Sequence, residues 1–259
     1  MSETDLGATP YIRIKTLMQR LRADCPWDST QTFESIAPYT IEESYEVSDA
    51  IEQKDMGQLK SELGDLLFQV LFHSILAEEI DAFNIDDVCD SLVEKMISRH
   101  PHVFIADSTE QPLWEDIKAS ERAKASQDGG SVLDGVALAL PALMRAEKLQ
   151  KRAARVGFDW PDISGVTDKI SEEALEVAEA IKSGSRDAIE DEIGDLLFAI
   201  TNLARHAKVD PEVALRRTNT KFTRRFHHIE KTSSKLLEEM TLEEMDALWT
   251  DAKTQEKPN

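Results

Sequence analysis

The sequence predicts an all-α protein built from two tandem helical-bundle modules, and three observations support this prediction. Apolar residues recur at steps of three and four positions, and no long segment has the alternation of a β-strand. Glycine is scarce, at 10 of 259 residues, which is about 4% where about 7% is usual. A pattern of acidic and apolar residues also occurs twice, as expected for a duplicated module.

The first module contains two predicted helices. One includes residues 41–47, and the other spans residues 59–75. The second helix is apolar almost all the way round, which is typical of a helix buried on several sides. We therefore expect it in the middle of a bundle, where a subunit interface could also cover it. Its apolar positions are Leu59, Leu63, Leu66, Leu67, Phe68, Val70, Leu71, Phe72 and Ile75.

Glycines predict how these two helices meet. Residues 50–56, followed by Gly57, indicate a helix end and a short connection. Gly64 lies inside the second helix, where glycine costs about 0.5–1 kcal/mol relative to alanine. We expect a close helix–helix approach behind Gly64, and behind Gly194 in the second module.

The second module repeats the first at a constant spacing. Glu173 lies 130 positions after Glu43 (173 − 43), and the same spacing relates Glu176 to Glu46, Glu192 to Glu62 and Asp195 to Asp65. Weaker matches have slightly different spacings, because loops change length between copies. These matches pair Trp27 with Trp160, Lys95 with Lys221, and Arg99 with Arg225.

The repeat defines the predicted domains. The N-terminal module comprises residues 1–122 and the C-terminal module comprises residues 136–259. Residues 123–135 contain a Gly-Gly pair and small polar residues, which indicate a linker. The last residues, TQEKPN, are expected to fray.

The charge excludes several classes of partner. The chain has 30 Lys and Arg against 50 Asp and Glu, for a net charge of −20. We expect no nucleic acid polymer and no anionic membrane as a partner, because both require an excess of basic residues. The longest apolar run, residues 196–200, is far below the roughly 18 residues of a membrane span.

The N-terminus and the cysteines indicate a compartment. The sequence begins MSETDLGATP, without the basic and apolar stretches of a secretory signal. Cys25 and Cys89 form neither a CxxC motif nor a disulfide framework. We expect a cytoplasmic protein.

The repeated acidic residues share helix faces. At about 100° per residue, Glu172, Glu173 and Glu176 fall within one arc of about 100°. Glu192 and Asp195 are three positions apart and point the same way on the next helix. If the two helices pack by these faces, four or five carboxylates converge.

Converging carboxylates require a cation. A single acidic pair on a helix is usually a solvated face, but here the pattern is duplicated and partly embedded in an apolar helix, where lone acids are costly. Oxygen ligands without His or Cys favour Mg²⁺, with Mn²⁺ as a possible substitute, over Zn²⁺. Such a cation suits attack of water on a phosphoanhydride.

The chain resembles the MazG nucleoside triphosphate pyrophosphohydrolases over residues 11–255. The resemblance rests on two acidic pairs, EESYE with ELGDLLFQ and EEALE with EIGDLLFA. Further shared motifs are CPWD, RHPHVF, ALPALMRAEKLQKRAARVGFDW and NTKFTRRF. The resemblance implies an intertwined homodimer and Mg²⁺-dependent hydrolysis of NTP or dNTP to the monophosphate and pyrophosphate. It also implies a house-cleaning or stress-related role in nucleotide metabolism.

The resemblance also implies site residues in the C-terminal module. The metal ligands would be Glu173, Glu176, Glu192 and Asp195, and Glu172 would complete the catalytic group by orienting water or a ligand. Trp249 would lie near the base, although packing on the bundle explains it equally well, and Trp160 is expected to pack in the core or at a helix cap. The substrate phosphates would meet Lys169, Lys221, Arg224 and Arg225.

The N-terminal module retains a second candidate metal site, formed by Glu43, Glu46, Glu62 and Asp65. Its basic residues are fewer, with Lys95 and Arg99 as weaker candidates for substrate binding. We therefore predict that the C-terminal module is the main catalytic one, and that the N-terminal site is active, vestigial or regulatory. The alternative is a nucleotide or Mg²⁺ sensor without turnover in one or both modules. Base preference, the phosphorus attacked, the general base and the number of metal ions stay open.

Overall fold

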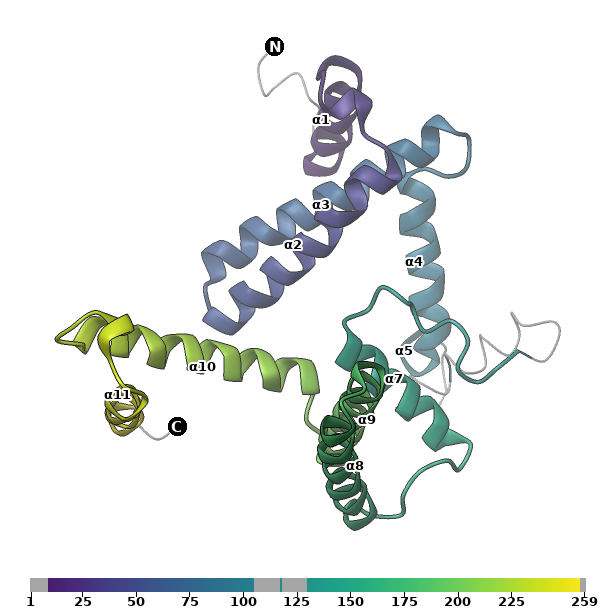
Figure 1. Cartoon of the computed structure of the whole chain (residues 1–259). Helices are drawn as coiled ribbons and strands as arrows, with labels where there is room; N and C mark the ends of the chain where they lie inside the picture. Colours follow the sequence, from purple (N-terminus) through teal and green to yellow (C-terminus); the bar gives the residue numbers. More distant parts are fainter. Residues whose placement is uncertain (1–8, 105–116, 118–129, 257–259) are drawn as a thin grey trace. The chain divides into compact units, whose positions relative to one another are not determined.

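The computed structural model describes residues 9–104, 117 and 130–256. Within these ranges the regular structure is entirely helical, so the predicted all-α fold is confirmed (Figure 1). The chain divides into two compact units, Met1–Lys124 (unit 1) and Ala125–Asn259 (unit 2). The division falls within the predicted linker, of which the structure describes only residues 130–135; the module bounds themselves stay a prediction.

Unit 1 is built on a helical hairpin. Helix α2 packs along α3, and α1 and α4 also contact α3. Their common core contains Met18 from α1, Ile36 from α2, Phe72 from α3 and Ile85 from α4. The elements of the unit are α1 (Pro10–Asp24), the 3-10 helix η2 (Asp28–Thr30), α2 (Phe33–Gln53), α3 (Met56–Glu79), α4 (Ile85–Arg99) and the short α5 (Pro101–Phe104).

Unit 2 repeats this arrangement. Helix α8 packs along α9 as α2 does along α3, and α7 packs on α9. Helix α10 contacts α7 and α9 near its start and then runs away from the hairpin, with α11 packed on its far part (Figure 1). The elements of the unit are α7 (Ala142–Arg155), α8 (Ile163–Ser183), α9 (Arg186–His206), α10 (Pro211–Thr232), the 3-10 helix η3 (Leu237–Glu239) and α11 (Leu242–Gln255).

The predicted end of the first hairpin helix is wrong, as the turn between α2 and α3 shows. Helix α2 ends at Gln53, and Lys54 follows in the left-handed conformation with φ 59°. Asp55 then caps α3 by accepting hydrogen bonds from the backbone of Gly57 at 2.9 Å and of Gln58. Gly57 is therefore inside the first turn of α3 and does not end α2. In unit 2 the left-handed position, 130 residues later, is occupied by Gly184 with φ 77°.

Two expectations about the second helix of each hairpin are wrong for the single chain. Helix α3 is not buried on several sides, because Leu67 is 46% exposed, and Leu197, its counterpart on α9, is 48% exposed. No close approach exists behind Gly64 or Gly194, where an added Cβ would meet nothing within 4 Å beyond the adjacent residues and backbone of its own helix, among the described residues. These outward faces lack a covering element in the described part of one chain.

Among the helices of the described ranges, none is both long enough and apolar enough to span a bilayer.

Candidate active site

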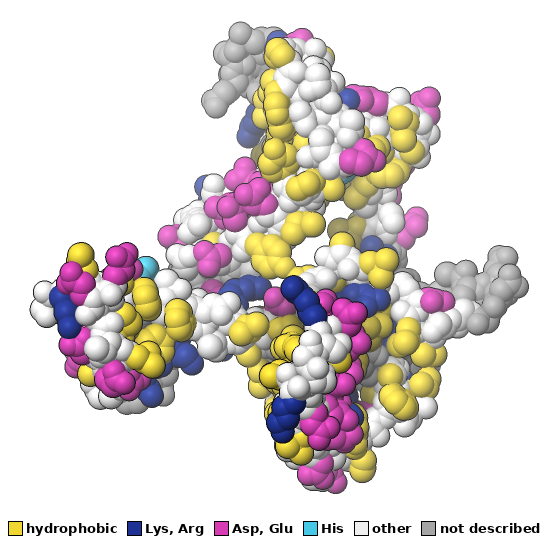
Figure 2. Space-filling model, in the orientation of Figure 1, with side chains coloured by type: hydrophobic (Ala, Val, Ile, Leu, Met, Phe, Trp, Pro, Cys, Tyr) yellow, Lys and Arg dark blue, Asp and Glu magenta, His cyan; other side chains and the backbone are white. Residues whose placement is uncertain are grey.

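The hairpin of unit 2 brings the predicted acids together. Glu173 and Glu176 come from α8 and Glu192 comes from α9, and one carboxylate oxygen of each lies within 4.8 Å of the others. Asp195 is outside this group of three but lines the same cavity as Glu173. Acidic side chains gather visibly on this hairpin in the space-filling view (Figure 2). Most of the predicted ligand set therefore converges.

Glu173 is the buried member of this cluster, with 4% of its surface exposed. One of its oxygens is ion-paired with Lys169 at 2.7 Å, and Lys169 also donates to Glu172 at 2.9 Å. The other oxygen, Oε2, is buried without a hydrogen-bond partner. An unsatisfied buried acceptor costs about 1–3 kcal/mol, so this oxygen marks a position that a cation would stabilise.

The charges of the cluster act on one another. Burial, followed by the charges of Glu173, Glu192 and Glu172, raises the pKa of Glu176 above its usual value. Hydrogen bonds to Glu173 and Glu172 raise the pKa of Lys169, which is therefore a persistent cation. One lysine beside four or five acids leaves an excess of negative charge, which a divalent cation would offset.

Unit 1 forms the corresponding cluster from Glu43, Glu62 and Asp65, whose carboxylates also lie within 4.8 Å of one another. Burial and the charges of Asp65, Glu46 and Glu62 raise the pKa of Glu43. Burial, and then the charge and hydrogen bond of Glu46, raise the pKa of Glu62. Glu46 is thus beside the cluster although it is not one of the three closest residues. Lys95 and Arg99 lie near the end of α4.

The predicted phosphate-binding residues other than Lys169 lie in one cluster on α10, apart from the acids, and two of them contact residues at or beside α11. Both Arg224 and Arg225 are ion-paired with Glu256 at 2.6 Å. The Arg225 guanidinium lies 5.3 Å from the ring centre of Trp249, which is also 5.3 Å from the ring of Phe222. Lys221 is exposed on α10. In one chain this cluster lies on the part of α10 that extends away from the α8–α9 hairpin (Figure 1).

Glu256 is a contact that the sequence did not indicate. The tail was expected to fray, but α11 continues to Gln255 and Glu256 is held by two arginines. These hydrogen bonds lower the pKa of Glu256 to about 2. No local pattern links an acid to arginines more than 30 positions earlier, so only the packing of α11 on α10 reveals this contact.

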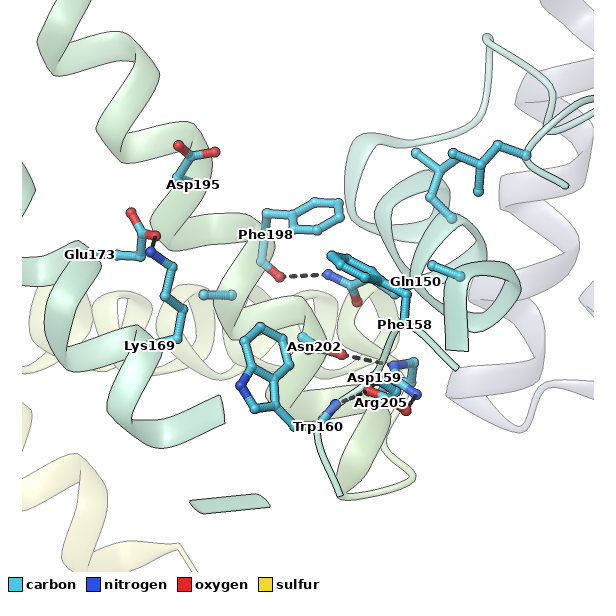
Figure 3. Close-up of a pocket in the computed structure, with 14 residues that line it drawn as sticks. Gln150, Phe158, Asp159, Trp160, Lys169, Glu173, Asp195, Phe198, Asn202 and Arg205 are labelled. Atoms are coloured by element: carbon cyan, nitrogen blue, oxygen red, sulfur yellow. Dashed lines mark hydrogen bonds and ion pairs between the residues drawn. The ribbon is translucent and has the colours of Figure 1, made fainter. Parts of the chain in front are cut away.

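A cavity of about 500 Å³ opens beside the acids of unit 2. Lys169, Glu173 and Asp195 lie at one side of it, and Gln150 and Asn202 lie toward the other (Figure 3). Aromatic side chains of Phe158, Trp160 and Phe198 also line it. The sequence did not single out Gln150 or Asn202, because each sits at an ordinary position of an amphipathic helix.

Trp160 only partly meets its expected packing role. The indole lies so close to Gly165, in the first turns of α8, that a Cβ at this glycine would overlap it. Trp160 nevertheless remains 41% exposed and contributes to the cavity wall. One side of the ring packs on the protein and the rest is open.

Fold and site together define an all-α protein with two acid-lined helical hairpins, each suited to a hard divalent cation. Comparison with known proteins makes this class specific. The chain belongs to the MazG nucleotide pyrophosphohydrolase family, whose domain model matches residues 31–104 and 163–230. The two matches contain the two acidic hairpins, so the predicted family and its tandem arrangement are confirmed.

Relatives extend this similarity over almost the whole chain. The nucleoside triphosphate pyrophosphohydrolase of Escherichia coli K12 is 48% identical, over 94% of this chain and 97% of its own length. The nucleoside triphosphate pyrophosphohydrolase/pyrophosphatase MazG of Thermotoga maritima is 46% identical, over 94% and 95%. The uncharacterized protein YabN of Bacillus subtilis is 44% identical, over 95% of this chain but 52% of its own length.

Proposed function

We propose that this protein is a nucleoside triphosphate pyrophosphohydrolase, which hydrolyses NTP or dNTP to the monophosphate and pyrophosphate. The observation that carries the proposal is the buried Glu173 carboxylate, with one partnerless oxygen, at the centre of converging acids. The relatives from E. coli and T. maritima, matched over nearly their full lengths, carry this activity in their names. A house-cleaning role in nucleotide metabolism is consistent with this chemistry.

The donor set fits Mg²⁺, with Mn²⁺ as a possible substitute, because all the candidate ligands are carboxylate oxygens. Glu173, Glu176, Glu192 and Asp195 would hold the cation. When bound, the cation would lower the pKa of a water molecule and offset charge on the phosphates. Glu172 is more exposed than Glu173 and would orient water or a ligand.

The basic residues bind the triphosphate in this proposal. Lys169 is next to the acids, where it can contact a phosphate that also reaches the cation. Lys221, Arg224 and Arg225 supply charge-assisted hydrogen bonds, which arginine makes in pairs to phosphate oxygens. The guanidinium of Arg225 lies over the ring of Trp249, which helps to hold it in place.

A homodimer would complete the site. The exposed apolar faces of α3 and α9 require cover, and the basic cluster on α10 and α11 has to approach the acids of a hairpin. Pairing of helices across two subunits meets both requirements.

We expect Leu197→Asp, on the exposed face of α9, to shift the protein to monomer in light scattering after size-exclusion chromatography. Leu242→Asp, at the exposed start of α11, serves as the control; a wild-type monomer would contradict the proposal.

The N-terminal hairpin is proposed as a second cation site, with Glu43, Glu46, Glu62 and Asp65 as ligands and Lys95 and Arg99 as possible contacts to phosphate. It lacks a counterpart of Lys169, because residue 39 is a tyrosine. This difference favours a regulatory or sensing role for unit 1, while unit 2 is the catalytic module. A cytoplasmic location remains part of the proposal.

The test is turnover of a panel of NTPs and dNTPs with Mg²⁺, in which the monophosphate and pyrophosphate are both measured. Glu176→Ala and Asp195→Ala should abolish turnover while circular dichroism stays unchanged. Glu46→Ala and Asp65→Ala are the matched controls in unit 1. Orthophosphate as the main product would contradict the proposed reaction, and full activity of both unit 2 variants would contradict the assigned module.

A further inference from the structure

We infer that the cavity beside Glu173 binds the heterocyclic base of the nucleotide, with Trp160 as the stacking surface and Gln150 as the polar partner. The inference rests on the proposed function and adds a binding site for the base, to which that function assigns no cavity. It assigns specificity-determining roles to residues of α7, α9 and the segment before α8.

The cavity has the size and the polarity that a nucleoside requires. Its volume of about 500 Å³ is within the range of roughly 300–1,000 Å³ that is typical of small-molecule sites. Its lining is mainly apolar and aromatic, while the charged Lys169 and Glu173 lie at one side and the amides lie at the other (Figure 3). A nucleotide has the same polarity, with charged phosphates at one end and a flat, largely apolar base at the other.

Gln150 carries the strongest indication of a missing partner. Its side chain is 7% exposed, and its Nε2 donates to the backbone carbonyl of Phe198 at 2.8 Å. Because a carbonyl can only accept, this bond fixes the orientation of the amide. The Oε1 atom is then left buried without a partner. An exocyclic amino group or a ring N–H of a base would satisfy it.

Asn202 supplies the complementary group. It is 5% exposed, and its Oδ1 accepts from the Nε of Arg205 at 2.8 Å. Arginine is a donor only, so this contact leaves the Asn202 Nδ2 as a donor for a ligand. Arg205 is itself held by Asp159 at 3.0 Å. The cavity therefore offers one acceptor and one donor, and the hydrogen-bonding edges of bases carry the reverse pair.

Unit 1 indicates that these polar residues are not a requirement of the fold. The residue 130 positions before Asn202 is Phe72, which is almost completely buried in the unit 1 core. The residue 130 positions before Arg205 is Ile75, which also packs against that core. Unit 1 does bury Gln69 elsewhere on α3, but these two positions are apolar there and polar in unit 2. Buried polar groups destabilise a core unless they have partners, so the polar residues at these two positions point to a ligand.

The stacking surface is Trp160. Its close contact with Gly165 fixes the ring, and the exposed part of the ring is available to a ligand. Trp249 is the other tryptophan proposed to lie near the base, but Phe222 and Arg225 already contact its ring. Since a base stacks on an open aromatic face, Trp160 is the better placed of the two.

The experiment compares full-length variants with Mg²⁺, using ATP, GTP, CTP and UTP for turnover and inorganic tripolyphosphate for binding by calorimetry. Tripolyphosphate has no base and reports on the phosphate site alone. Trp160→Ala should raise the KM of the affected NTPs about tenfold, the scale of one lost stacking contact. Gln150→Leu should raise KM as well and should change the ranking of the four NTPs. Neither change should alter the affinity for tripolyphosphate.

Controls separate base binding from a structural role. Trp160→Phe should restore most of the affinity, and melting temperatures of all the variants should stay close to that of the wild type. Unchanged KM values in both variants, or a KM effect confined to Trp249→Ala, would overturn the inference. Equal weakening of tripolyphosphate and NTP would assign these residues to folding instead. Failure of the proposed function would look different, because the wild type would then neither turn over NTP nor bind tripolyphosphate.

Discussion

The two acid clusters of this chain have the same ligand types at the same spacing but different surroundings. In unit 2 the central acid, Glu173, is buried and paired with Lys169, whereas in unit 1 Glu43 is only half-buried and the lysine position is Tyr39. The neighbouring helix of unit 2 carries Asn202 where unit 1 has Phe72 in its core. The acids therefore define a candidate cation site in each unit, while the residues around them decide what else can bind there.

The largest difference between the units can be removed by making unit 2 resemble unit 1. Asn202→Phe places the unit 1 side chain in the cavity of unit 2, so we expect kcat/KM for NTPs to fall about 100-fold, because both space and a hydrogen-bonding group are lost. Steady-state kinetics measures this fall. Phe72→Asn is the reverse variant; it should lower the melting temperature, with no gain in turnover. Normal kinetics of Asn202→Phe would show that the cavity is not used.

The charge difference at the acid cluster gives a smaller effect. Lys169→Tyr creates the unit 1 residue and removes a charge-assisted contact, so we expect about a tenfold loss in kcat/KM, equivalent to about 1.4 kcal/mol. Tyr39→Lys introduces the missing lysine in unit 1. If unit 1 is a regulatory site, turnover should change little in this second variant. A larger effect of Tyr39→Lys than of Lys169→Tyr would reverse the assignment of the two units.

The smallest predicted effect concerns the two arginines of α10 in unit 2, which are already ion-paired with a carboxylate. Glu256 occupies Arg224 and Arg225, so a triphosphate has to compete with it. We expect Glu256→Gln to lower the KM for NTPs by at most about fivefold, the scale of an exposed ion pair. Kinetics at neutral pH, compared with Glu230→Gln on α10, the helix of Arg224 and Arg225, measures the change. An increase in KM would mean that Glu256 assists substrate binding.

The same contact predicts an acid-sensitive attachment of α11. Hydrogen bonds to Arg225 and Arg224 lower the pKa of Glu256 from 4.5 to about 2. The stabilising contribution is therefore complete above about pH 4.5 and is lost as the pH falls toward 2. The fluorescence of Trp249, in a protein where the other tryptophans are replaced by phenylalanine, should change over this window. Glu256→Gln should abolish that part of the change.

Much of the fold and of the acid clusters could be predicted from the sequence. The positions of Glu173, Glu176 and Glu192 on helix faces follow from their spacing, and the repeat identifies the second copy. Helical periodicity could not say that α3 and α9 remain half-covered in one chain, because the pattern records which faces are apolar and not what covers them. The sequence does not predict the end of α2 correctly, because Lys54, and not a glycine, adopts the left-handed conformation there.

The remaining features depend on contacts between distant segments. Gln150 on α7 donates a hydrogen bond to the backbone carbonyl of Phe198 on α9. No pattern in the neighbouring sequence predicts that Gln150 is buried. Asn202 is polar at a position where the repeat has a core phenylalanine, which is a signal that comparison of the two modules could have revealed. Glu256 is visible only once α11 is packed on α10.

The most direct test of the catalytic role of unit 2 is pyrophosphate release by two matched variants, Glu173→Gln and Glu43→Gln, assayed with Mg²⁺ beside the wild type. We predict that Glu173→Gln loses turnover by at least about 100-fold, comparable to the loss of one group that stabilises transition-state charge. Glu43→Gln should retain most of the activity. Retained activity in Glu173→Gln, with loss in Glu43→Gln, would contradict the assignment and place catalysis in unit 1.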